Sequence, residues 1–466
     1  MAVSPPAAGM ERRALLAALG AAGATGLLAG CTDRTGSGSP TPNGTEPPSE
    51  SPTDPPGSPS PSEGSAGEPS GAAVRWTHEL GGPVNHAPML ADGTLYVAGG
   101  ANAQGTPPRD NPVGPDTSQN LLALSTAGEE RWRYESDAAM QSRPVLADGA
   151  VHVVTGWSNG YSGVGARLLR VESDGSFAWS NGPRSRFLSI LGHAEGTVFV
   201  GTSDDAIGAT GESLFAVGPD GTTEWTVESG DAFDGTVHDG TLYVDNGGMR
   251  LLAIAPSDGS TRWSSDLGLP GPLAVYGDTI YLDATSENEN DDYPLVAVDA
   301  ATGEERWRYG VDMPDRFVVS GALEAAGSTF VTEYDGLLAA LDPADGSERW
   351  RYDADARTGE FRVHDGTLYL PAGGDLHAVD AATGEGQWTR SVGSHVWRAY
   401  PSDAGVVVRA RSGGDRDLFA GFDPDGTERW TFESAGGLTL PAVDGLRAYV
   451  GTESGYVAAL GSETDG

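Results

Sequence analysis

Short segments of alternating hydrophobic and polar residues recur throughout residues 73–466. A typical unit has an Asp-Gly turn, a Thr-Leu-Tyr-Val stretch, a Leu-x-Ala-x-Asp stretch, and then a Trp four residues after a Gly. A period of two indicates half-buried strands, and the glycines suit tight hairpins because they accept positive φ. No part of this region has a long 3.6-residue apolar period. We therefore expect four short strands per unit and an all-β fold.

The Gly/Trp pair marks the repeat most clearly. Trp76 opens the series without its Gly, and successive tryptophans lie 38 to 56 residues apart. Four strands in a repeat of this length are typical of a β-propeller blade. A large aromatic side chain at a fixed repeat position is best explained by packing of blade against blade. The tryptophans that we assign this structural docking role are Trp132, Trp179, Trp225, Trp263, Trp307, Trp350, Trp388 and Trp430.

The two ends of the repeat region predict how the ring closes. Residues 74–77 form a lone Trp strand, whereas the last unit, residues 441–460, lacks one. The N-terminal strand can therefore complete the last blade, which removes an open sheet edge. This count gives nine blades, and eight is the alternative if one unit is irregular.

The run Leu-x-Ala-x-Asp-x-x-Thr-Gly-x-x-x-Trp at residues 295–307 and 376–388 resembles the repeat of pyrroloquinoline-quinone-type (PQQ-like) β-propeller proteins. The resemblance covers nearly all of residues 73–466. It implies a propeller in which each Trp docks between adjacent blades. Members of this family usually form seven or eight blades, so a count of nine departs from the family pattern.

The same resemblance raises the question of quinone chemistry. Quinoprotein dehydrogenases of this family have an Asp base, a calcium ion and, in some members, a vicinal cysteine pair. The only cysteine here is Cys31, so that pair is impossible, and no His-x-x-x-His spacing or nucleophile elbow is present. We expect no catalytic residue, no metal and no cofactor. PQQ with calcium is expected only under the alternative of an exported sugar or alcohol dehydrogenase.

Residues 1–31 have the pattern of an export signal. Arg12 and Arg13 precede an apolar run, and the pair resembles a twin-arginine signal, with ordinary secretion as the alternative. The run Leu-Ala-Gly-Cys that ends at Cys31 resembles the lipobox of lipoprotein signal peptides, in which the Cys becomes the lipid-bearing first residue. We therefore expect a protein lipid-anchored to the outer face of the cytoplasmic membrane.

A linker separates this anchor from the repeats. Residues 32–72 contain Ser, Pro, Gly, Thr and acidic residues but no aromatic residue, Val, Ile, Leu or Met. Such a composition cannot bury enough apolar surface to offset its ordering entropy. We expect a disordered stalk with a reach on the order of 35 Å, followed by the propeller at 73–466.

The chain is strongly acidic, with 66 Asp and Glu, 28 basic side chains and a net charge of −38. All the basic side chains are arginine. The scarcity of cations argues against nucleic acid as a partner. Because the acidity is spread along the whole chain, we interpret it as adaptation to high salt, where self-repulsion is screened. In this respect the chain resembles secreted haloarchaeal proteins.

Several basic residues precede or begin the predicted first strands, which line the axis of a propeller. They form a candidate ligand site at the channel mouth, because arginine pairs bidentately with carboxylates. The alternative is that they pair with Asp231, Asp315 and Glu360 of the chain itself. The candidate residues are Arg143, Arg186, Arg316, His395, Arg398 and His86.

Other polar features have simpler explanations. We expect His152, His238 and His364, which lie in or beside Asp-Gly hairpins, to face solvent. The acidic loop at residues 287–292 lacks EF-hand spacing and is interpreted as a solvated loop.

Together, these patterns predict a non-catalytic, monomeric, cell-surface lipoprotein propeller. Its role is that of a scaffold that binds an unknown protein or a small anionic ligand.

Overall fold

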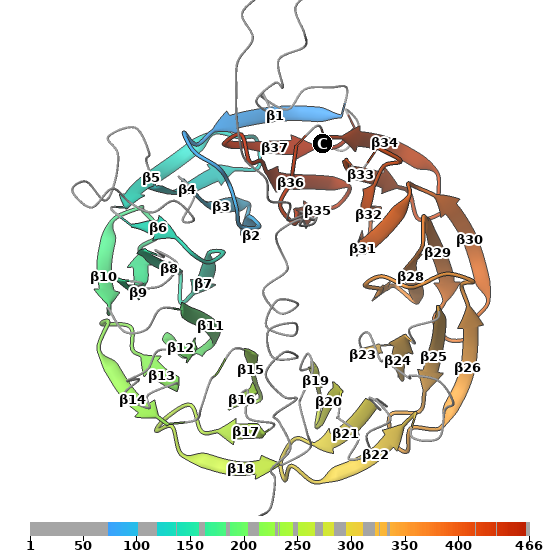
Figure 1. Cartoon of the computed structure of the whole chain (residues 1–466), viewed down its shortest axis with the longest axis horizontal. Helices are drawn as coiled ribbons and strands as arrows, with labels where there is room; N and C mark the ends of the chain where they lie inside the picture. Colours follow the sequence, from blue (N-terminus) through green and yellow to red (C-terminus); the bar gives the residue numbers. More distant parts are fainter. Residues whose placement is uncertain are drawn as a thin grey trace, which may run out of the picture. The chain divides into compact units, whose positions relative to one another are not determined.

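The computed structural model describes most of the repeat region. The described residues are 73–100, 119–136, 138–157, 164–182, 187–203, 214–228, 232, 234–245, 250–265, 274–283, 295–310, 322–325, 327–332, 336–414, 416–434 and 436–462. Their regular elements are all strands, and no helix occurs among them. The strands form nine antiparallel sheets arranged in a ring (Figure 1). We number these sheets blade 1 to blade 9.

The first four blades follow one another along the chain. Blade 1 contains β2 (Met89–Ala91), β3 (Thr94–Gly99), β4 (Gln119–Ser125) and β5 (Glu130–Ser136). Blade 2 contains β6 (Ala139–Met140), β7 (Val145–Ala147), β8 (Ala150–Trp157), β9 (Val164–Val171) and β10 (Phe177–Asn181). Blade 3 contains β11 (Phe187–Ala194), β12 (Thr197–Ser203), β13 (Leu214–Val217) and β14 (Thr223–Val227). Blade 4 contains β15 (Asp234–His238), β16 (Thr241–Asp245), β17 (Leu251–Ile254) and β18 (Thr261–Ser265).

The remaining blades continue this order, and the last one also takes a strand from the start of the chain. Blade 5 contains β19 (Ala274–Tyr276), β20 (Thr279–Asp283), β21 (Leu295–Asp299) and β22 (Glu305–Tyr309). Blade 6 contains β23 (Ala322–Ala325), β24 (Ser328–Thr332), β25 (Leu337–Leu341) and β26 (Glu348–Asp353). Blade 7 contains β27 (Arg362–His364), β28 (Thr367–Ala372), β29 (Asp375–Asp380) and β30 (Gly386–Ser391). Blade 8 contains β31 (His395–Ser402), β32 (Gly405–Arg411), β33 (Asp417–Phe422) and β34 (Glu428–Glu433). Blade 9 contains β35 (Ala442–Asp444), β36 (Arg447–Gly451), β37 (Tyr456–Leu460) and β1 (Val74–Glu79).

The all-β propeller prediction is confirmed. Eight of the nine sheets have four strands, with the first strand toward the ring axis and the fourth at the rim (Figure 1). Blade 2 is the irregular one, because its inner edge is divided between β6 and β7, which both pair with β8. The predicted signal peptide and linker, residues 1–72, lie outside the described residues.

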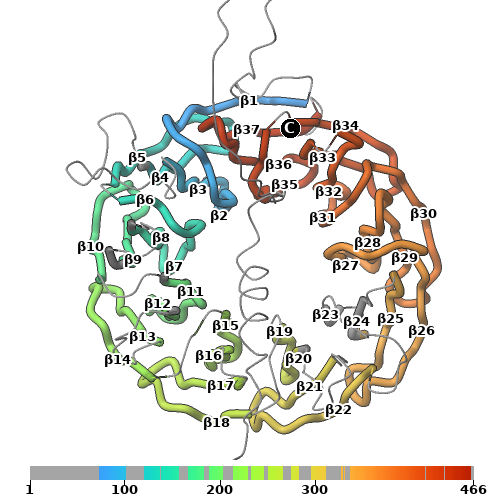
Figure 2. The backbone as a smooth tube through the Cα atoms, in the orientation of Figure 1, coloured from blue at the N-terminus to red at the C-terminus, as the bar shows by residue number. Residues whose placement is uncertain are grey.

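The ring closes through the first strand of the chain. β1 pairs antiparallel with β37, placing Thr77 opposite Ala458, and Gly461 N–H donates a hydrogen bond of 2.9 Å to the Ala73 carbonyl. Figure 2 shows this junction, where the blue strand β1 lies beside the red strand β37. The predicted pairing of residues 74–77 with the last unit is therefore correct. β1 thus supplies the outermost strand of the last blade, so the outer edge of β37 is not left open.

Each rim tryptophan reaches the next blade. For eight of the nine tryptophans, all but Trp430, the ring lies against the glycine of the next Gly/Trp turn, and a Cβ added to Gly303, for example, would stand 2.5 Å from Trp263 Cε3. Most of the indole N–H groups also donate to a backbone carbonyl of the next blade. These donors and distances are Trp76 3.0 Å, Trp132 2.8 Å, Trp179 2.8 Å, Trp225 2.8 Å, Trp263 3.0 Å, Trp307 2.8 Å, Trp388 2.9 Å and Trp430 2.9 Å. Trp350 also lies against its glycine, Gly384, but its buried Nε1 has no hydrogen-bond partner among the described residues.

The strand pairing explains the alanine of the Leu-x-Ala motif. In seven blades an alanine of the third strand lies opposite the rim tryptophan, as Ala297 lies opposite Trp307, and the small side chain leaves space for the indole. Blade 8 has Gly421 and blade 2 has Arg170 at this position. In all nine blades a β-bulge makes the strand register skip the residue before the tryptophan. Bulges of this kind redirect side chains, so the motif sets both the space and the direction of the indole.

The core consists of separate apolar layers between neighbouring blades. One layer joins Phe215 of blade 3 to Leu168 of blade 2, and another joins Phe419 of blade 8 to Leu446 of the segment between blade 9's first two strands. Because each layer involves only two adjacent blades, stability is shared around the ring.

A disulfide across the closing pair tests the ring junction. Directly opposite residues of antiparallel strands have Cα atoms about 4.5–5.5 Å apart, which is within disulfide range. In a Cys31→Ser background, we expect oxidised Thr77→Cys/Ala458→Cys protein to migrate faster on non-reducing gels and to gain about 2–4 kcal/mol of stability. Either single variant should do neither, and failure of the double variant to crosslink would contradict the pairing.

The tryptophan–glycine contact is tested by two matched alanine substitutions. Gly303 and Gly366 have nearly the same φ, +76° and +74°, but nothing lies within 4 Å of a Cβ added to Gly366. Both Gly→Ala changes incur the left-handed backbone cost of about 1–2 kcal/mol. Only Gly303→Ala should incur a further 1–3 kcal/mol or so from the collision with Trp263. Equal losses in chemical denaturation would show that the contact is unimportant.

Candidate functional site

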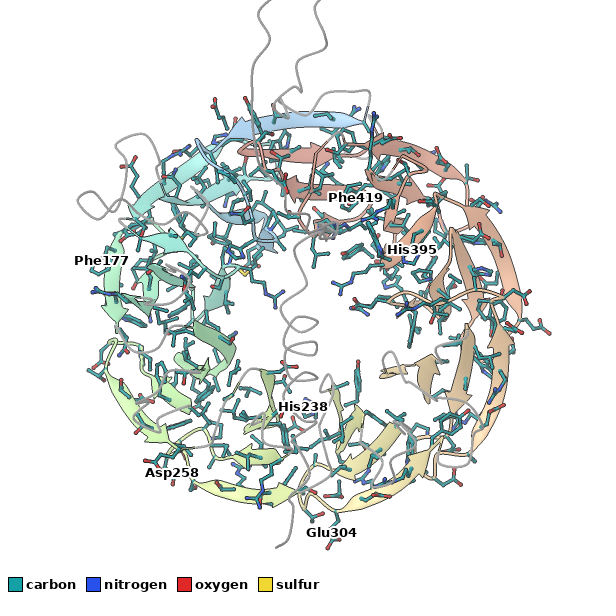
Figure 3. All side chains as sticks on the ribbon, viewed as in Figure 1. Phe177, His238, Asp258, Glu304, His395 and Phe419 are labelled. Atoms are coloured by element: carbon teal, nitrogen blue, oxygen red, sulfur yellow. The ribbon has the colours of Figure 1, made fainter. Side chains whose placement is uncertain are left out.

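The predicted channel-mouth residues fall at different places in the ring. His86 Nε2 lies 3.2 Å from the Met140 carbonyl of blade 2, and burial lowers the pKa of His86. Arg143 precedes β7 and is exposed. His395 and Arg398 lie together on β31, and Figure 3 labels His395 on the axis side of the ring. The other two candidates, Arg186 and Arg316, lie outside the described residues.

Arg398 meets a carboxylate of the neighbouring blade. It forms an ion pair with Glu360, in the segment that leads into β27, and Arg362 binds the same carboxylate. The side chains of Arg398 and Glu360 are 31% and 33% exposed, so the pair is neither fully solvated nor fully buried. Pairing with Glu360 was the alternative expected from the sequence, and for Arg398 it is what the structure shows. Two guanidinium groups on one carboxylate leave a surplus of positive charge.

A second group of cations surrounds Trp397 on the same strand. The guanidinium carbons of Arg409 and Arg411, both from β32, lie 5.1 Å from the centre of the Trp397 ring, which is within cation–π range. His395 meets the same ring edge-on at 5.8 Å. Burial lowers the pKa of His395, and the positive charges of Arg357 and Arg411 lower it further. Both effects favour the neutral form of His395.

The backbone holds this region rigidly. A bulge at Trp397 interrupts the pairing of β31 with β32, and the freed groups pair with blade 7 instead. The Trp397 carbonyl accepts from Glu360 N–H at 2.8 Å, and Val396 N–H donates to the Gly373 carbonyl at 2.7 Å. The bulge thus joins the inner edges of blades 7 and 8 and presents Arg398 to Glu360.

A half-buried tyrosine completes the group. Burial raises the pKa of Tyr400, which the nearby charges of Arg398, Arg409 and Arg362 partly oppose. The Tyr400 hydroxyl lies within reach of Arg398, yet no hydrogen bond of ordinary geometry joins them. We call Arg357, Arg362, Arg398, Arg409 and Arg411 the arginine cluster.

Sequence reasoning found one member of the arginine cluster, Arg398, and missed four. The available signal was the Arg-x-Arg spacing at 409 and 411, which places both side chains on one face of a strand. No local pattern connects this spacing with Arg357 or Arg362, which come from the preceding blade.

Comparison with known proteins identifies the family. A family model described as outer membrane protein assembly factor BamB matches residues 117–212, 210–364 and 334–464. The chain belongs to this family. The PQQ-like repeat expected from the sequence is thereby confirmed at the level of the BamB family. No curated protein matches the chain.

The solved structures that match the chain do so at low identity. BamB from Moraxella catarrhalis is 16% identical, with 68% of this chain and 95% of that chain covered and a TM-score of 0.47. The computationally designed Ika8 protein is 13% identical, with 79% and 100% covered and a TM-score of 0.48. Quinohemoprotein alcohol dehydrogenase from Comamonas testosteroni is 13% identical, with 83% and 76% covered and a TM-score of 0.45.

The described part of this BamB-family propeller contains neither a metal-binding cluster nor a membrane-spanning helix. This part contains no cluster of three or more His, Cys, Asp or Glu that could hold a metal ion. In the part of the chain that the structure describes, no helix is long and apolar enough to cross a membrane. The acidic loop at residues 287–292 lies outside the described residues.

One histidine prediction is wrong. His152 is fully buried, because it takes the place beneath a rim tryptophan that Tyr or Phe fills in most blades, and its ring lies 5.7 Å from that of Trp179. Neither ring nitrogen makes a hydrogen bond of ordinary geometry. Burial, followed by the charge of Arg170 opposite it, lowers the pKa of His152 to about 4. His238 and His364 are partly exposed, with 30% and 34% of their side chains accessible.

The buried His152 predicts a pH dependence of stability. The unfolded chain binds a proton near pH 6.5, but the folded chain resists protonation until about pH 4, so stability falls as the pH drops through this window. The expected loss is about 3 kcal/mol, compared by urea unfolding at pH 7 and pH 4. His152→Phe should remove most of this loss, whereas His238→Asn should retain it. An unchanged pH dependence in His152→Phe would contradict the assignment.

Proposed function

We propose that this BamB-family propeller is an exported, lipid-anchored scaffold that binds a partner or ligand and catalyses no reaction itself. The observation that carries the proposal is the arginine cluster at the inner edge of blades 7 and 8. It concentrates cations in a chain with a net charge of −38. Guanidinium groups gathered in this way suit the binding of an anionic group.

Three of the described histidines make contacts that suit a structural role better than a catalytic one. His238 Nε2 lies 2.9 Å from the Gly277 carbonyl, His364 Nε2 lies 2.9 Å from an Asp403 oxygen, and His377 Nδ1 lies 2.9 Å from the Tyr352 hydroxyl. The first two contacts join neighbouring blades, and the third joins the rim strands of blade 6 to blade 7. These histidines are therefore used in holding the ring together.

The anchor is the second part of the proposal. Cys31 is the single cysteine of the chain and ends a lipobox-like run, and Arg12 and Arg13 stand ahead of it. Residues 32–72 would then hold the propeller clear of the outer face of the cytoplasmic membrane. The acidity of the chain and its lack of lysine support a salt-rich, haloarchaeal setting.

The scaffold role is tested by isolating the protein with its partners. Affinity purification of the full chain from native membranes at high salt should recover a specific partner or an anionic ligand. The competing function is a quinone-dependent dehydrogenase. Addition of PQQ, calcium and an electron-acceptor dye should give no turnover with aldoses or alcohols, and turnover would overturn the non-catalytic assignment.

The lipid anchor makes a separate prediction. Cys31→Ser should move the protein from the detergent phase to the aqueous phase in Triton X-114 partition, because the acyl-bearing thiol is lost. Thr32→Ser, one residue later, should partition like the wild type. Equal partition of Cys31→Ser and the wild type would show that Cys31 is not the anchor.

A further inference from the structure

We infer that the junction between blades 2 and 3 is an acid-sensitive joint, which opens at low pH while the other blades remain folded. The inference goes beyond the proposed scaffold function and does not depend on it. It rests on a row of three side chains, His152, Arg170 and Trp179, which lie opposite one another on β8, β9 and β10.

This row differs from the corresponding row of a regular blade. In blade 4 the row consists of Tyr243, Ala253 and Trp263, paired in the same way. The tyrosine hydroxyl and the indole N–H there both donate to the Ala300 carbonyl in the turn of blade 5, each at 3.0 Å. Blade 2 has His in place of the Tyr and Arg in place of the Ala, so two changes occur in one row.

Arg170 makes the bond to the next blade that the tyrosine makes in blade 4. Its Nη1 donates to the Pro219 carbonyl of blade 3 at 3.2 Å, and Trp179 Nε1 donates to the same carbonyl at 2.8 Å. Its Nε donates to Glu172 at 3.0 Å. Arg170 therefore keeps blade 2 hydrogen-bonded to blade 3, and His152 is not needed for this purpose.

His152 lies at this junction as a neutral aromatic ring. It is fully buried against the ring of Trp179, which in turn lies against Gly221 of blade 3. Neither nitrogen of the His152 ring makes a hydrogen bond of ordinary geometry. A protonated imidazole would bring a charge into this position without an acceptor, and burial of an unpaired charge is strongly unfavourable. The closed junction therefore accepts only the neutral form.

The charged groups around His152 do not favour its protonated form. Arg170 is a second cation, and the Glu172 carboxylate is already bound to it. β11 of blade 3, which packs against β8 and β9, has one titratable side chain, His193, which is exposed. β7 and β10 have none, and Asp148 in the turn after β7 is exposed. Burial and then the charge of Arg170 accordingly lower the pKa of His152 to about 4.

The junction can open without unfolding of the whole ring. The apolar layer between blades 2 and 3, which includes Leu168 and Phe215, consists only of side chains from these two blades. Loss of this layer leaves the layers between the other blades intact, so local opening costs less than global unfolding. The inner edge of blade 2 is also irregular, because it is divided between β6 and β7.

The size of the pH effect follows from the two protonation equilibria. The pKa of His152 is about 4 in the closed form and rises to the ordinary 6.5 once water reaches the ring. Because the open form binds more protons, opening becomes more favourable as the pH falls. Between pH 7 and pH 5 the equilibrium constant for opening should increase about twentyfold.

Hydrogen exchange measured by mass spectrometry tests the joint. The full chain is compared at pH 7 and pH 5, at a salt concentration that keeps it folded, and the data are corrected for the intrinsic exchange rate. Amides of β8, β9 and β11 should lose protection about twentyfold at pH 5. Those of β16 and β17 in blade 4, whose row contains Tyr243, should retain theirs.

Substitutions show whether His152 controls the opening. His152→Phe should abolish the loss of protection, because Phe cannot be protonated and Phe199 fills the same position in blade 3. His152→Tyr, which restores the residue found in blade 4, should do the same and is a second test if one variant folds poorly. His238→Asn, at the partly exposed histidine of blade 4, should retain the loss.

Two results would overturn the inference. Equal loss of protection in the wild type and in both His152 variants would show that another group opens the junction. Equal loss in blade 2 and blade 4 would show that acid loosens the whole ring. Neither result would bear on the scaffold role, which is tested by recovery of a partner at high salt.

Discussion

The contact between a rim tryptophan and the glycine of the next blade is the constraint on which the ring depends. Gly303, with φ of +76°, has no side chain to keep the ring of Trp263 away, and a Cβ there would stand 2.5 Å from it. An indole buries about 150–250 Å² in such a contact. Because most blades repeat the contact with a hydrogen bond to a turn carbonyl, blade-to-blade spacing is set at the rim. Pairing of β1 with β37 then makes the series continuous.

Fixing the blades at the rim leaves the inner strands freer to vary. Blade 2 divides its inner edge between two short strands, and β31 of blade 8 carries a bulge at Trp397. Neither irregularity interrupts the tryptophan contacts, since Trp179 and Trp388 both reach their carbonyl acceptors. The inner edge is therefore where a propeller of this kind can acquire a binding site without losing its ring.

The sequence predicts what is repeated and local. The Leu-x-Ala-x-Asp-x-x-Thr-Gly-x-x-x-Trp run contains the strand, the turn, the glycine and the alanine opposite the tryptophan. The fold can be predicted because this pattern recurs about every 43 residues. The burial of His152 was not predicted, because the residues around it have the pattern of an ordinary hairpin strand. Its burial results from the contact with Trp179 across the blade. Position in the repeat, where most blades have Tyr or Phe, was the signal that could have shown it.

The arginine cluster could not be predicted as a whole, because it depends on contacts between blades. Arg398 was found from its place on a first strand, but Glu360 and Arg362 reach it only through the bulge that joins blades 7 and 8. At such a bulge the strand can hydrogen-bond either to the next strand of its own blade or to the neighbouring blade. No local sequence pattern determines which of the two it pairs with.

The acidity of the chain and its arginine cluster are compatible if salt is high. At low salt, a net charge of −38 would repel an approaching carboxylate over many ångströms. At 1 M salt the Debye length is about 3 Å, so this long-range repulsion is screened. A hydrogen-bonded contact such as that of Glu360 with Arg362 is partly shielded from solvent and is screened much less. In the salt-rich setting proposed above, short-range pairing by arginine forks would therefore select the ligand, and the overall charge would maintain solubility.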